Sequence, residues 1–199
     1  MSYVSTVLTF IFIENVVLTY FLGICPFLTS TRNVKTAFRI GIVLTVLMTL
    51  LSVVTWAARR WILLPLGAEH LQLVVFAFLI GVVGQLSYAL FRRWSPRRIA
   101  VARRYFVLIV ANASLFGILL ISSYRSYAFL DSLLAAAAGG IGFLLAVVGL
   151  AAVRERLEYE AVPGSFRGGP IILISAGLFS LAFQAFDKLF LMSLFALQP

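Results

Sequence analysis

A single cysteine and three other polar residues stand out in otherwise apolar stretches of the chain: Cys25, Glu14, Asn15 and Asn112. The thiolate of Cys25 is a soft ligand of the kind that binds iron in proteins. The carboxylate of Glu14 is costly in apolar surroundings unless it is neutral, paired or hydrated, which makes it a functional candidate; the alternative is a structural glutamate that is protonated, bonded to another helix or close to the outer headgroups. The two asparagines can bond backbone groups across a helix break. No nucleotide-binding, zinc-protease or hydrolase motif accompanies them, so no catalytic residue is predicted.

These residues lie in apolar runs that are long enough to cross a membrane. Five uncharged runs each reach roughly the 18–20 residues that span ~30 Å of hydrocarbon, and a sixth carries only Glu14. The runs are Ser2–Leu28, Ile40–Ala58, Leu71–Phe91, Tyr105–Tyr124, Ser132–Val153 and Gly168–Phe186. Composition agrees, with 62% hydrophobic residues and a mean hydropathy of +1.07. Because these runs are too long for barrel strands, we predict an all-α polytopic membrane protein with six transmembrane helices.

Positive charges gather in alternate connectors, and this pattern predicts an orientation. Of the 16 lysines and arginines, twelve follow the first, third or fifth run. These twelve are Arg32, Lys35, Arg39, Arg92, Arg93, Arg97, Arg98, Arg103, Arg104, Arg154, Arg156 and Arg167. Cytoplasmic loops carry an excess of such residues, so both termini are expected outside the cytoplasm. The Arg92–Arg104 cluster is interpreted as a topology signal that contacts anionic lipids, and no nucleic-acid partner is expected despite the net charge of +9.

Three runs precede the large basic loop and three follow it, which is the topology of an inverted repeat. The halves are predicted at about 1–93 and 104–199 within one domain, 1–199. The first run, with Asn15 and Gly23-Ile24-Cys25-Pro26, would then correspond to the fourth, with Asn112-Ala113-Ser114. Because Pro26 lacks a backbone donor and Gly23 adds flexibility, the first helix is predicted to break near Cys25.

Small residues at helical spacing predict close packing in two of the runs. Ala138, Gly142 and Ala146 form one ridge in the fifth run. A second ridge in the third run consists of Ala77, Gly81 and Gln85. Small side chains allow helices to approach closely in lipid, so both ridges are expected to contact neighbouring helices.

Several motifs together resemble the A-type subunit of Rnf ion-translocating electron-transport complexes, which is similar in turn to the E-type subunit of the sodium-translocating NADH:quinone oxidoreductase. They are Glu14-Asn15, Phe21–Phe27, Arg154–Leu157, Val162-Pro163, Phe166–Gly168 and Ser175–Phe183. The resemblance covers nearly the whole chain. It implies a bacterial cytoplasmic membrane protein with a 3+3 inverted repeat, in which broken helices one and four meet near the midplane. It also implies a homologous six-helix partner of opposite orientation and further Rnf-type subunits.

In that family, the A-type subunit contributes two cysteines to one intramembrane [2Fe-2S] cluster, and its partner contributes two more. Cys25 matches the first cysteine by its Gly-x-Cys-Pro-Phe context. The second cysteine should follow Asn112, but Ala113 stands there, and a methyl group cannot bind iron. The resemblance therefore implies Cys25 as the metal ligand, Asn15 and Asn112 as supports of the cofactor site, and Glu14 as an ion-path residue.

We therefore predict a membrane subunit of an Rnf-like complex that couples electron transfer to Na⁺ or H⁺ translocation and is not an autonomous enzyme. One alternative is a small stand-alone transporter whose inverted repeat encloses a substrate site without a redox centre. Another is a scaffold subunit that binds no cluster. A co-purified six-span partner with two cysteines would exclude the transporter, and iron in the complex would exclude the scaffold.

The predicted orientation can be tested by labelling. In a Cys25→Ser background, cysteines introduced at Ser95 and Ser165 should be protected from an impermeant thiol reagent in intact cells, because both lie in basic loops. Labelling of either position from outside would contradict the orientation.

Overall fold

The computed structural model describes residues 3–23, 33–94, 112–160 and 163–184. Within these residues the chain is helical and contains no strand. The α-helices are α1 (Tyr3–Leu8), α3 (Val34–Ala58), α4 (Gln72–Trp94), α6 (Ala113–Tyr124), α7 (Phe129–Leu157) and α8 (Gly169–Gln184). Thr9–Ile13 and Arg59–Leu63 are π-helical turns, and Glu69–Leu71 and Gly164–Phe166 are 3₁₀ turns. The prediction of an all-α protein is confirmed.

Three of these segments are long and apolar enough to cross a membrane: Val34–Leu63, Gln72–Leu90 and Phe129–Leu157. Two shorter apolar helices, α6 and α8, lie where the fourth and sixth spans were predicted. Residues 105–111 of the fourth predicted span lie outside the described part of the chain. The structure thus agrees with a polytopic membrane protein, and it differs most from expectation in the first span.

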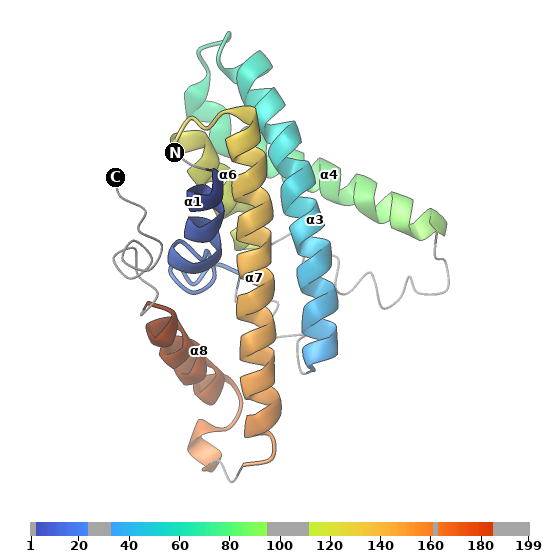
Figure 1. The fold of residues 1–199 in the computed structure, drawn as a ribbon. Coiled ribbons are helices and arrows are strands. Elements are labelled where there is room, and N and C mark those ends of the chain that lie inside the picture. Colours follow the sequence, from blue (N-terminus) through green and yellow to red (C-terminus); the bar gives the residue numbers. More distant parts are fainter. Residues whose placement is uncertain (1–2, 24–32, 95–111, 161–162, 185–199) are drawn as a thin grey trace.

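The centre of the fold is an antiparallel pair formed by α3 and α7, which lie side by side in Figure 1. Near one end of the pair, the Ser52 hydroxyl donates to the carbonyl of Ser132 at 3.0 Å. At mid-length, a Cβ on Gly140 would lie 2.8 Å from the Cα of Thr45, so the two backbones almost touch. Glycine is needed at position 140 because any side chain would separate the helices.

The two predicted small-residue ridges behave differently. Ala138, Gly142 and Ala146 are all buried on α7, and a Cβ on Gly142 would lie 2.9 Å from the carbonyl oxygen of Phe10. This ridge packs against the first helix, as its spacing predicts. The ridge on α4 does not contact another helix of the described chain, since Ala77 and Gln85 are exposed and a Cβ on Gly81 would meet nothing within 4 Å. The buried residues of α4 include Phe76 and Ile80, each one position before a ridge residue, so the ridge lies on a different face of the helix. Much of α4 also extends away from the α3–α7 pair (Figure 1).

The contrast between the two ridges gives a matched test. Gly142→Leu should lower the thermal stability of the purified protein by roughly 1–3 kcal/mol or more, because the new side chain collides with the first helix. The same change at Gly81 meets open space and removes a glycine from a helix, so it should be neutral or slightly stabilising. Equal loss of stability in both variants would contradict the packing described here.

Candidate functional site

The first helix ends at Ile13, about ten residues before the predicted break near Cys25. It closes with a π-helical turn in which the Glu14 N–H donates to the Thr9 carbonyl at 2.7 Å. Glu14 then leaves helical geometry, with φ −100° and ψ 41°. The predicted position of the break is therefore corrected to Glu14–Asn15, while Cys25 and Pro26 lie outside the described residues.

Asn15 explains why the helix stops there. Its side chain is fully buried, and its Oδ1 accepts hydrogen bonds from the N–H groups of Val17 and Leu18 at 3.1 and 3.4 Å. Its Nδ2 donates to the carbonyl of Ile11 at 3.1 Å and to that of Gly142, in the middle of α7, at 2.8 Å. One side-chain amide thus pairs with two backbone N–H groups after the break, one carbonyl before it and one carbonyl of α7. Buried polar groups require such partners.

Asn112, the second predicted asparagine, lies directly before α6. It is the N-cap residue, and its Oδ1 accepts from the Ser114 N–H at 3.0 Å. The side chain is 3% exposed, and its Nδ2 is buried without a hydrogen-bond partner within the described residues. Asn15 therefore lies where the first helix ends and Asn112 where α6 begins, and Asn112 retains a buried donor.

Two serines join the irregular segment after Asn15 to other helices. The Ser114 hydroxyl donates to the Leu22 carbonyl at 2.6 Å, and the Ser180 hydroxyl of α8 donates to the Leu18 carbonyl at 2.5 Å. These bonds give hydrogen-bond partners to carbonyls of a segment that forms no regular helix. Sequence analysis did not assign a role to either serine. The signal available for Ser114 was its place in the Asn112-Ala113-Ser114 segment.

Gly23 brings the chain close to the start of α6. Its φ is +84°, and a Cβ there would collide with Ser114 Oγ and lie 2.5 Å from Asn112 Oδ1. Only glycine fits this conformation and this space. Gly23 precedes Cys25 by two positions and packs against Asn112 and Ser114, the two residues that flank Ala113, where the second cysteine is expected. Ala113 itself is exposed, directed away from the interior of its own chain.

Glu14 forms an ion pair that sequence analysis did not predict. Its Oε1 lies 2.6 Å from Nη2 of Arg125, just after α6, and Arg125 also donates to the Tyr127 hydroxyl at 3.1 Å. These two hydrogen bonds raise the pKa of Arg125 above its usual range, so the guanidinium stays charged. It lies 5.8 Å from the centre of the Phe10 ring, a cation–π contact. The second oxygen of Glu14 is buried and has no hydrogen-bond partner in the described part of the chain.

The described residues contain no group of three histidine, cysteine or acidic side chains that could hold a metal ion. Cys25 is the only cysteine of the chain. The position where the second cysteine is expected holds the exposed residue Ala113. A contribution of two thiolates from this chain to a shared cluster therefore does not fit the residues present.

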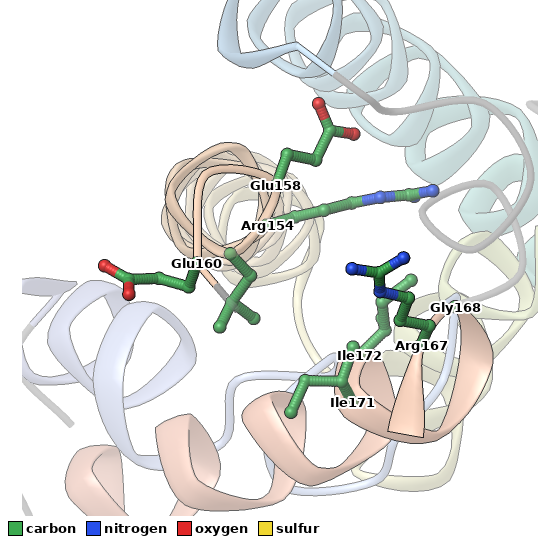
Figure 2. A pocket seen from close by; sticks show the side chains of 8 residues that line it. Arg154, Glu158, Glu160, Arg167, Gly168, Ile171 and Ile172 are labelled. Carbon is green, nitrogen blue, oxygen red and sulfur yellow. The ribbon is translucent and has the colours of Figure 1, made fainter. Parts of the chain in front are cut away.

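A charged pocket of about 360 Å³ lies at the other end of α7, between its last turns and the start of α8. Figure 2 shows the guanidinium groups of Arg154 and Arg167 on the same side of this pocket, while the side chain of Glu160 points away from them. The two arginines belong to two of the motifs that carry the family resemblance. The pocket is separated along α7 from Gly142 and the helix break.

The two asparagines allow a matched test of the break. Asn15→Asp keeps an acceptor for Val17 but replaces the donor to Gly142 with an oxygen that faces two carbonyls, so stability should fall by roughly 2–4 kcal/mol. Asn112→Asp keeps the N-cap bond and loses a donor that has no described partner, so its effect should be clearly smaller. Thermal unfolding of the two variants measures the difference, and equal effects would contradict the assigned role of Asn15.

Comparison with known proteins identifies the family of this chain. The model of the "Rnf-Nqr subunit, membrane protein" family matches residues 3–190. A relative from Sodalis glossinidius, named as the A-type subunit of an ion-translocating oxidoreductase complex, is 39% identical over 95% of this chain and 96% of its own length. One of the same name from Edwardsiella ictaluri is 38% identical over 90% and 93%. A relative from Acetobacterium woodii, named as the A-type subunit of a Na⁺-translocating ferredoxin:NAD⁺ oxidoreductase complex, is 36% identical over 94% and 97%. The chain therefore belongs to the Rnf-Nqr family of membrane-protein subunits.

Proposed function

We propose that this chain is the A-type membrane subunit of an Rnf-type complex that couples electron transfer to the translocation of Na⁺ or H⁺ across the bacterial cytoplasmic membrane. The observation that carries the proposal is the pair of buried asparagines, one just after the end of the first helix and one at the N-cap of α6. Asn15 and Asn112 begin two segments that the Ser114–Leu22 hydrogen bond joins. Irregular backbone at membrane depth is tolerated where it is buried in protein or lines a water-filled cavity, and discontinuous helices of this kind form ion and substrate sites in membrane transporters.

The arrangement of α3 and α7 supports a 3+3 inverted repeat with halves at about 1–93 and 104–199. These two helices are antiparallel, and α3 follows Asn15 in the chain as α7 follows Asn112. In the proposed topology both termini are extracytoplasmic, as the distribution of basic residues favours. We propose a homologous six-helix subunit of opposite orientation as the direct partner. The names of the relatives, each a subunit of a complex, support further subunits as partners.

For the cofactor, we propose an asymmetric contribution in which Cys25 is the single ligand of this chain to an intramembrane [2Fe-2S] cluster shared with the partner. When bound, such a cluster supplies one-electron transfer. The residues of this chain fix the segment around it: Asn15 ends the first helix, Gly23 permits close approach to α6, and Asn112 caps α6. Exposure of Ala113 supports a site that opens toward another subunit.

Glu14 is proposed as an ion-path residue. Its buried Oε2 has no partner among the described residues and can bind a cation or a proton, while its Oε1 accepts a hydrogen bond from Arg125. The competing role is structural, since the ion pair also fixes the start of the helix break against the connector between α6 and α7.

A scaffold role without a cluster is the second candidate, and Ala113 is the observation that favours it. A cluster with three cysteine ligands is more easily lost than one with four, because lability depends on ligand charge and solvent access. If the scaffold role holds, Cys25 is an inert thiol and the helix break serves assembly only.

Iron analysis of the purified complex, with its electron paramagnetic resonance spectrum, separates the two candidates. Cys25→Ser should reduce bound iron and the cluster signal, whereas Ala113→Cys should strengthen retention of the cluster by adding a thiolate. Ala113→Ser serves as the control, because it adds a polar atom without a thiolate. If the complex contains no iron at this interface and Cys25→Ser leaves electron transfer unchanged, the cluster proposal is wrong.

A further inference from the structure

A second polar pocket, distinct from the helix break, lies where the end of α3, the start of α4 and the end of α6 meet. It encloses about 410 Å³. Its lining residues are Arg59, His70, Gln72, Leu73, Ser123, Tyr124 and Ser126. A small adjoining cavity is lined by Arg59, Ser122 and Ser123 among others, so the two spaces share a wall. None of these residues contributes to the function proposed above.

The pocket contains buried polar groups whose hydrogen-bonding capacity is unused. Nε of Arg59, Nε2 of Gln72 and Oγ of Ser123 are each buried without a hydrogen-bond partner among the described residues, and so is Oγ of Ser122 next to them. Ser123 is only 7% exposed. Buried polar groups in folded proteins almost always have a partner, so several such groups around one pocket indicate that water or a polar ligand fills it.

The chemistry of the lining defines this ligand. Arg59 is a permanent cation, and its Nη2 donates to Ser126 Oγ at 3.1 Å, which fixes the guanidinium at the pocket. The amide nitrogen of Gln72 and the hydroxyl of Ser123 add neutral donors. The lining residues that the structure describes include no carboxylate. A phosphate group, with a negative charge and several acceptor oxygens, matches this set.

The rim of the pocket points to a lipid as the source of the phosphate. Tyr124 of the lining is 76% exposed, and Trp61, two residues after Arg59 in the chain, is 75% exposed. Aromatic residues of these two types concentrate at the headgroup level of a membrane. Leu73, also at the pocket, is half exposed and apolar. We propose that the pocket binds the phosphate of an anionic phospholipid. A bound headgroup joins the start of α4, which otherwise extends away from the bundle, to α3 and α6 (Figure 1).

Lipid titration of the delipidated, purified complex tests the proposal. Phosphatidylglycerol should raise the thermal unfolding midpoint, because a ligand that binds the folded state stabilises it. Phosphatidylethanolamine should have a weaker effect, since its ammonium group finds no described carboxylate in the pocket. Gln72→Met and Ser123→Ala should weaken the apparent affinity for phosphatidylglycerol roughly ten-fold or more, as loss of a hydrogen bond to a charged group does.

The choice of variants separates binding from folding. Neither Gln72 Nε2 nor Ser123 Oγ has a described internal partner, so Gln72→Met and Ser123→Ala should not destabilise the lipid-free complex. Arg59→Gln should also weaken binding, whereas Arg60→Gln, an exposed neighbour outside the pocket lining, should bind like the unmodified complex. Equal weakening at Arg59 and Arg60, or no shift with phosphatidylglycerol, would overturn the proposal. An equal shift with inorganic phosphate alone would assign the pocket to free phosphate and overturn the lipid source.

Discussion

The structure depends on one constraint: a backbone that leaves helical geometry inside an apolar environment must still satisfy its N–H and C=O groups. Asn15 meets this constraint with a single side chain, which bonds donors of Val17 and Leu18 and carbonyls of Ile11 and Gly142. Ser114 and Ser180 satisfy two further carbonyls of the same segment. The irregular segment is therefore anchored by α6, α7 and α8 rather than by its own local structure.

The same constraint explains the small residues of α7. The carbonyl of Gly142 can reach Asn15 because no side chain keeps the first helix away from α7. Two positions earlier, Gly140 allows the opposite contact with Thr45 of α3. The helix α7 thus packs against the first helix on one side and against α3 on the other, and each contact requires a glycine of α7. This accounts for the close approach of the first helix and of α3 to α7.

The long helices could be predicted from sequence because continuous apolarity is a direct consequence of a lipid environment. The predicted run Ser132–Val153 lies within α7, and Leu71–Phe91 matches α4 to within a few residues. The break in the first span was located wrongly, since Pro26 and Gly23 are local signals whereas Asn15 ends the helix through a contact 127 residues away. The partner of Glu14 was missed for the same reason: Arg125 is adjacent in space, and nothing in the spacing of the two residues indicates it.

The bond between Asn15 and Gly142 also has a consequence for biogenesis. The first segment enters the membrane early in synthesis, but the acceptor that completes its fold belongs to the fifth predicted span. Until α7 arrives, the amide of Asn15 and the carbonyls around it need substitute partners, from water, lipid headgroups or insertion factors. The amino-terminal segment is therefore the first part of the chain to be made and among the last to reach its final form.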